Sequence, residues 1–167
     1  FGASIARRGS ETSSYLTRMH RDLRNHSGGY RLLINMLVML DAFTLENGAT
    51  YVLSGSHHSA EAPEEHAFRT QAERLTGPSG SIVLFDSNLW HAAGANRTDA
   101  PRAALTLTFS RPFFKQQMDY PRFLGNAYMA GVPERVRQVL GYYARTPASY
   151  DEWYRPREAR MYRADQG

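Results

Sequence analysis

The sequence contains no cysteine among its 167 residues, and its 20 basic residues include a single lysine, Lys115. Without cysteine the chain can form no disulfide framework, no thiolate zinc site and no cysteine nucleophile. Histidine and carboxylate side chains remain as the strong metal ligands. Any metal bound by this chain must therefore accept nitrogen and oxygen donors.

Long hydrophobic runs are also missing, because no window approaches the ~20 apolar residues of a membrane-spanning helix. Hydrophobic residues make up 42% of the chain and charged residues 22%, as in ordinary globular proteins. The length predicts a single domain over residues 1–167, with residues 112–167 as a helical or irregular C-terminal extension. Because the chain starts at Phe1 without an initiator Met or a signal peptide, we expect a fragment of a longer cytoplasmic protein.

The net charge is only +4, and basic and acidic residues are intermixed, as at Glu134, Arg135 and Arg137. Such mixing is typical of a solvated surface rather than of a nucleic-acid-binding stripe. We expect no nucleic-acid and no membrane partner, and a small molecule as the substrate. The pattern leaves the oligomeric state open.

Several segments have the composition of strands. Residues 30–40 (YRLLINMLVML) are apolar enough for a buried strand, although a buried helix has the same signal; residues 50–53 and 81–86 add two shorter candidates. Residues 102–110 alternate strictly, with apolar side chains at odd positions and small or polar ones at even positions, which puts Arg102 on the polar face.

The remaining segments predict loops and helices. Residues 1–15 mix Gly, Ser and Arg without periodicity and predict a loop, whereas residues 63–75 (PEEHAFRTQAERL) begin with Pro and two acids, as helices do. A short helix is expected over residues 133–145, and a helix or wrapping tail over residues 147–162. Short strands with helices at the ends predict a mainly β fold, an antiparallel sandwich or barrel with flanking helices.

The sharpest local motif is His20-Arg21-Asp22. On an extended chain, residues two apart point to the same side, so the imidazole and the carboxylate can bind one cation. His91, just after the strand at residues 81–86, is the candidate third ligand. Two histidines and one aspartate make the facial triad of non-haem Fe(II), which leaves coordination positions open for a cosubstrate and oxygen.

Three other residues are candidates for binding the cosubstrate. The guanidinium of Arg102 can pair with the far carboxylate of a dicarboxylate that chelates iron at its other end. Asn35 could hydrogen-bond the same molecule or be an amide satisfied within the sheet. The same two interpretations apply to Thr50.

These stretches resemble the phytanoyl-CoA dioxygenase family of Fe(II)- and 2-oxoglutarate-dependent oxygenases. The resemblance runs from His20 to Arg111 and is carried by HRD, by LDAFTLENGATYVLSGSHH at residues 40–58 and by LWHAAGANRTDAPRAALTLTFSR at residues 89–111. It implies a double-stranded β-helix, a cupin-like jelly roll. Because family members have a substantial region before the first ligand and only nineteen residues precede His20 here, we expect the chain to lack part of its N-terminal region.

The resemblance also implies an activity and a set of site residues. His20, Asp22 and His91 would bind Fe(II), and Arg102 would bind the C5 carboxylate of the cosubstrate 2-oxoglutarate. With O2, such an enzyme hydroxylates a small-molecule metabolite and releases succinate and CO2. Halogenating relatives have Ala or Gly in place of the carboxylate ligand, so the presence of Asp22 favours hydroxylation.

Two alternatives use the same residues. A non-catalytic jelly-roll module would bind the metal or ligand without turnover. A zinc hydrolase with the same triad would need no oxygen and form no succinate. A protein-kinase interpretation of HRDL fails, because the position that should hold the magnesium-binding Asn is Ser27 and no DFG motif follows.

Overall fold

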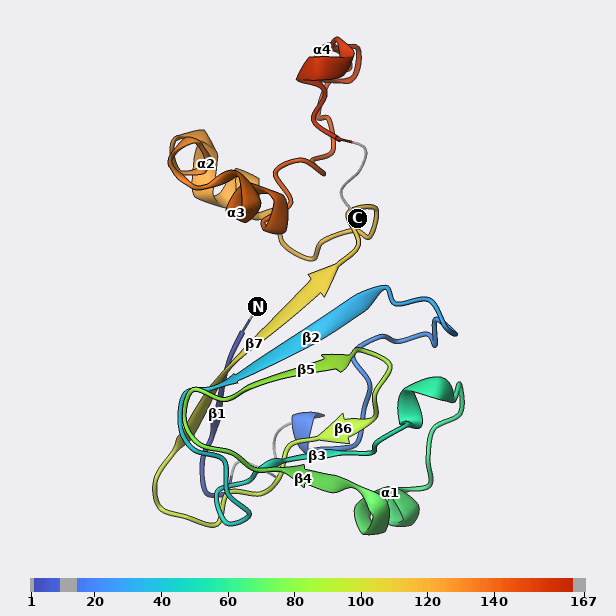
Figure 1. Cartoon of the computed structure of the whole chain (residues 1–167), viewed down its shortest axis with the longest axis vertical. Coiled ribbons are helices and arrows are strands. Elements are labelled where there is room, and N and C mark those ends of the chain that lie inside the picture. The colour runs from blue at the N-terminus through green and yellow to red at the C-terminus, as the bar shows by residue number, and fades with distance from the viewer. Residues whose placement is uncertain (1, 10–14, 164–167) are drawn as a thin grey trace. The chain divides into compact units, whose positions relative to one another are not determined.

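The computed structural model describes residues 2–9 and 15–163, which fall into two compact units divided between Phe109 and Ser110 (Figure 1). The elements of the first unit are β1 (Gly2–Ala6), β2 (Leu33–Met39), β3 (Thr50–Val52), α1 (Glu65–Gln71), β4 (Glu73–Leu75), β5 (Ile82–Asp86), β6 (His91–Ala92) and β7 (Arg102–Ser110), whose last residue crosses the division. The second unit contains α2 (Tyr120–Gly131), α3 (Glu134–Val139) and α4 (Tyr150–Trp153).

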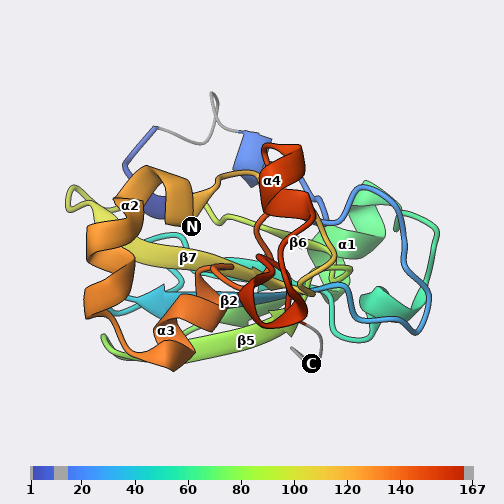
Figure 2. The same cartoon turned by 90° about the horizontal axis from the view of Figure 1, so that it is seen from above.

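The strands form two antiparallel sheets. The larger has the order β1-β7-β2-β5, and Figure 2 shows β7, β2 and β5 lying side by side. The smaller has the order β4-β3-β6, with Val52 of β3 paired with His91 of β6. Strands that are neighbours in a sheet are thus often distant in sequence, as expected for a jelly roll.

The hydrophobic core lies between the two sheets. Its buried members come from β2, from β7 and from the loop between β2 and β3, and the residues packed against them come from β4 and β5: Leu37, Met39, Phe43, Ala49 and Ala104, with Leu75, Val83 and Phe85. Because each sheet contributes one face to a shared core, the first unit is a two-sheet sandwich, as the strand pattern predicts, and it is the double-stranded β-helix that the family resemblance implies.

A close backbone approach joins the loop before β3 to the loop after β6. Gly48 has a φ of 87°, and a Cβ at this position would lie 2.5 Å from the carbonyl oxygen of Gly94. Only glycine fits both the left-handed conformation and this contact. The NGA turn of the sequence therefore holds the segment after His91 against the start of β3.

Two local predictions are wrong. The segment expected to be a loop at the N-terminus contains β1, which pairs with β7 along its length, from Gly2 opposite Thr106 to Ala6 opposite Arg102. The helix expected over residues 63–75 ends at Gln71, and Glu73–Leu75 form β4 against β3. In both places pairing with a distant strand decides the conformation, which local patterns do not report.

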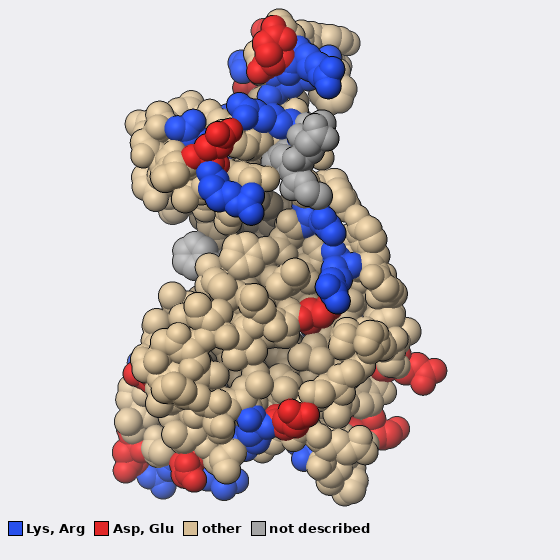
Figure 3. All heavy atoms as spheres, viewed as in Figure 1, with Lys and Arg blue, Asp and Glu red and all other residues tan. Residues whose placement is uncertain are grey.

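The second unit is helical and carries charges of both signs. Asp119 caps the start of α2 by accepting a hydrogen bond from the backbone of Arg122, and Arg163 pairs with Glu134 at 3.3 Å. Acidic and basic side chains lie next to each other on the face of this unit that Figure 3 shows. Within residues 2–9 and 15–163, no helix combines the length and apolar character needed to cross a membrane.

Candidate metal and cosubstrate site

The structure brings His20, Asp22 and His91 together. One ligand atom from each lies within 4.8 Å of the other two. The Nε2 atom of His20 is 3.7 Å from Oδ1 of Asp22, and Nε2 of His91 is 3.8 Å from Oδ2. Nitrogen and oxygen atoms at such separations surround a space in which one cation could contact all three.

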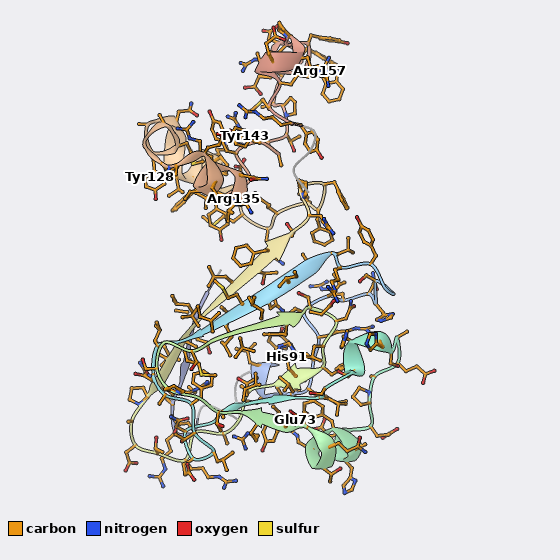
Figure 4. All side chains as sticks on the ribbon, in the orientation of Figure 1. Glu73, His91, Tyr128, Arg135, Tyr143 and Arg157 are labelled. Atoms are coloured by element: carbon orange, nitrogen blue, oxygen red, sulfur yellow. The ribbon has the colours of Figure 1, made fainter. Side chains whose placement is uncertain are left out.

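Backbone pairing brings the two histidines together. His20 and His91 form an isolated antiparallel bridge in which each backbone N–H donates to the other's carbonyl at 2.9 Å. The sequence places His20 and Asp22 on one extended segment, but only His20 is paired, and the chain bends at Asp22. His91 begins β6, directly after the turn that follows β5, and Figure 4 shows it between β5 and β3.

Each imidazole presents Nε2 to the cluster. The Nδ1 atom of His20 lies 2.9 Å from the carbonyl oxygen of Arg18, and that of His91 lies 2.9 Å from the carbonyl oxygen of Leu89. A carbonyl oxygen only accepts, so both Nδ1 atoms carry the proton and donate, leaving the Nε2 lone pairs available. Metal-binding histidines are commonly oriented by such hydrogen bonds.

Aromatic rings pack around the two imidazoles. Phe85 meets the His91 ring edge-on with 5.2 Å between centroids, and Tyr15 lies 4.7 Å from the His20 ring. Burial lowers the pKa of His91 below its usual value, against the opposing effect of Asp22. A lowered pKa keeps the imidazole neutral at neutral pH, the form that binds a metal. Tyr15 falls in the segment that the sequence predicts to be a loop, and no local pattern there indicates its ring contact with His20.

Asp22 accepts a hydrogen bond from Asn35, for which the sequence left two interpretations open, a cosubstrate ligand or an amide satisfied within the sheet. Asn35, on β2, donates from Nδ2 to Oδ2 of Asp22 at 2.5 Å and accepts at Oδ1 from the Thr108 hydroxyl at 2.8 Å. Both its polar atoms thus have protein partners. Thr50, on β3, shares a face with Val52, which pairs with His91, and its hydroxyl makes no hydrogen bond within the described residues.

Arg102 is buried at the start of β7, on the face that it shares with Ala104. Only 3% of its surface is exposed, and its guanidinium lies 3.8 Å above the Phe43 ring. Its Nε has no hydrogen-bond partner, and no ion pair within residues 2–9 and 15–163 involves it. Burial lowers the pKa of Arg102 to about 10, with Asp41 opposing and Arg74 adding to the shift. The group therefore stays charged at neutral pH.

The donor set and the arginine fit an iron centre with a dicarboxylate cosubstrate. Two neutral imidazoles and one carboxylate are the facial-triad ligands of non-haem Fe(II). A buried guanidinium without a partner is costly unless an anion joins it. The geometry thus contains a candidate cation site and, separately, a buried arginine without an ion-pair partner among the described residues.

Comparison with known proteins agrees with this description. The sequence profile of the family described as phytanoyl-CoA dioxygenase (PhyH) matches residues 3–104. Uncharacterized proteins from Mycobacterium tuberculosis and Mycobacterium bovis are each 41% identical over 148 residues, which is 89% of this chain and 54% of theirs. The chain spans about half the length of these curated relatives.

One relative and two solved structures add detail. A protein of Penicillium thymicola named iron/alpha-ketoglutarate-dependent dioxygenase is 40% identical over 76 residues, 45% of this chain and 24% of that protein. AviO1 from Streptomyces viridochromogenes shares the fold, with a TM-score of 0.53, 22% identity and coverage of 68% of this chain and 50% of that one. The apoform of EctD from S. alaskensis has a TM-score of 0.50 and 25% identity, covering 66% and 43%.

Proposed function

Because the chain belongs to the phytanoyl-CoA dioxygenase family, we propose that it carries the iron and cosubstrate site of an Fe(II)- and 2-oxoglutarate-dependent hydroxylase acting on a small-molecule metabolite. The reaction consumes one 2-oxoglutarate and one O2 for each hydroxylated product and releases succinate and CO2. Bound iron supplies the oxygen chemistry, which no amino-acid side chain provides.

The side chains of this protein bind and orient. His20, Asp22 and His91 would hold the metal through Nε2, a carboxylate oxygen and Nε2. With three protein ligands, the other positions are left for the cosubstrate and oxygen. The retained carboxylate of Asp22 fills the position that a halide would need, which supports hydroxylation over halogenation.

Arg102 is the observation that carries the proposal. A zinc hydrolase would have no use for a buried cation without a partner, whereas a dianionic cosubstrate needs one for its far carboxylate. Arg102 is 3% exposed and charged at neutral pH, so a carboxylate reaching its guanidinium would gain a strong hydrogen bond in a site with little water. Thr50 remains a candidate for a further hydrogen bond to the cosubstrate, and Asn35 has only its second amide proton left for one.

The direct test is succinate release. The protein is incubated with Fe(II), 2-oxoglutarate and O2 and screened against a panel of metabolites. We expect succinate that requires all three and increases with the true substrate. Turnover that proceeds with zinc and without O2 would instead support a hydrolase. Iron and 2-oxoglutarate binding without succinate, even with the panel, would support a non-catalytic module.

A further inference from the structure

A row of three side chains leads from the larger sheet to the metal-binding carboxylate. Thr108 on β7 donates to Asn35 on β2, and Asn35 donates to Asp22 in the loop between the first metal ligand and β2. Asn35 is 4% exposed, whereas about a third of the Asp22 side chain is open to solvent. The buried member of the row is thus the amide, and the partly exposed one is the carboxylate.

The hydrogen bonds in this row have only one possible direction. An ionised carboxylate has no proton to donate, so the amide nitrogen of Asn35 must face Asp22. The amide oxygen then faces Thr108, whose hydroxyl must donate. A flipped amide would place its oxygen against the carboxylate, and two acceptors would meet without a proton between them. The Asp22 carboxylate therefore sets the amide orientation, and Thr108 stabilises it by donating to the amide oxygen.

We propose that Asn35 is a positioning residue for the metal ligand Asp22, with Thr108 holding the amide in the orientation needed. This rests on the metal site of the proposed function. Asn35 donates to Oδ2, so Oδ1, 3.7 Å from Nε2 of His20, would be the oxygen left to hold a metal. Binding through one oxygen keeps the carboxylate from using a second coordination position, which the cosubstrate and oxygen need.

The proposal differs from a cosubstrate role for Asn35 in what it predicts. One of the two amide protons is already committed to Asp22, and the amide oxygen is committed to Thr108. Because Asn35 contacts Asp22 directly, its substitution should change metal affinity even when no cosubstrate is present. A cosubstrate ligand would affect the affinity for 2-oxoglutarate and leave metal binding unchanged.

The experiment is a titration of the 167-residue apoprotein with Co2+ in the absence of 2-oxoglutarate, followed by the d–d absorption of the bound ion. Asn35→Ala is expected to weaken Co2+ binding roughly 10- to 100-fold, the usual effect of removing an outer-shell partner. Thr108→Val is expected to weaken it about 2- to 10-fold, as for the loss of one hydrogen bond. Thr108→Ser, which retains the hydroxyl, should restore binding to within about twofold.

Thr106→Val is the matched control. Thr106 lies two residues earlier on the same face of β7, and its hydroxyl donates to the carbonyl of Gly2 outside the row. The same loss of a hydroxyl there should leave Co2+ affinity unchanged. Because Asn35 is buried and its variant could fail to fold, the threonine variants provide an independent test.

Three results would overturn the proposal. One is unchanged Co2+ affinity in a folded Asn35→Ala variant that needs more 2-oxoglutarate, which would make Asn35 a cosubstrate ligand. Another is unchanged affinity in Thr108→Val, and the third is equal losses in Thr108→Val and Thr108→Ser, which would mean packing rather than hydrogen bonding. Failure of the unmodified protein to bind Co2+ through His20 and His91 would instead reject the proposed function.

Discussion

The two ends of the candidate site are prepared in opposite ways. At the metal end, His20 and His91 are paired through their backbones, both imidazoles donate to carbonyl oxygens, and Asp22 accepts from Asn35. At the other end, Arg102 is more deeply buried than any of these ligands, yet its Nε has no partner in the described part of the chain. The metal end is held by contacts within the protein, and the arginine end is left unmatched.

This difference shows how the two ends contribute to stability. Ligands that already have hydrogen bonds are oriented at little cost to the fold, because the Nδ1 donors of both imidazoles are satisfied. An unpaired buried cation destabilises the folded state and regains that free energy when an anion binds. The unpaired Arg102 therefore lowers the stability of the ligand-free fold and raises its affinity for an anion. The metal ligands do not lower stability in this way.

The largest effect is expected from removing a metal ligand. Apparent zinc-binding free energies of about 10–16 kcal/mol shared among four ligands put one ligand near 3 kcal/mol, or roughly 100-fold in affinity. His91→Ala should weaken Co2+ binding by about this factor and abolish succinate formation. His66→Ala removes the same side chain from the exposed face of α1 and should change neither quantity. Equal behaviour of the two variants would disprove the role of His91.

A smaller effect, confined to the other end, is expected from Arg102→Ala. Loss of a hydrogen bond to a charged group, about 1.5–3 kcal/mol, should raise the KM for 2-oxoglutarate roughly 10- to 100-fold. Co2+ affinity should stay the same, because Arg102 makes no contact with the metal ligands. Arg97→Ala, at an exposed position five residues earlier, serves as the control. If Arg102→Ala weakens Co2+ binding instead, then Arg102 and the metal ligands do not act independently.

The smallest expected effect is a gain in stability rather than a loss of binding, and it comes from removing the charge of Arg102. Arg102→Met keeps an unbranched chain over Phe43 and removes the buried charge, but it also loses the favourable contact of the cation with the ring. We expect the free energy of unfolding without ligand to rise by about 1 kcal/mol. This corresponds to about 2–4 °C in Tm.

Arg97→Met is the matched control for stability and should leave Tm nearly unchanged. Adding 2-oxoglutarate with the metal should raise the Tm of the unmodified protein and have much less effect on Arg102→Met. A clear loss of stability in Arg102→Met would mean that the guanidinium already has a stabilising partner within the fold.

Much of the first unit could be predicted from the sequence because its signals are local. Strict alternation over residues 102–110 predicts β7 at the bounds observed and puts Arg102 on the polar face of the strand, which the structure buries at Arg102 and Ala104. The triplet His20-Arg21-Asp22 needs only the two-residue period to predict a shared site. The third ligand, His91, is predicted from its position after a strand, from the order of the motifs and from the family resemblance.

What was missed depends on contacts between distant residues. The five residues of β1 have no clear strand pattern and are extended because β7 lies beside them. The hydrogen bond between Asn35 and Asp22 joins a strand to a bend, and neither sequence segment indicates the other. The missing partner of Arg102 is likewise a property of packing, because burial and hydrogen bonding at a position follow from the whole fold.

The most direct test of the central claim is the absorption spectrum of the protein with Fe(II) and 2-oxoglutarate in the absence of oxygen. A cosubstrate that chelates iron held by His20, Asp22 and His91 produces a visible metal-to-ligand charge-transfer band. We predict this band in the unmodified protein, its absence in His91→Ala and a higher 2-oxoglutarate requirement for it in Arg102→Ala. No band in the unmodified protein at saturating iron and cosubstrate would contradict the account.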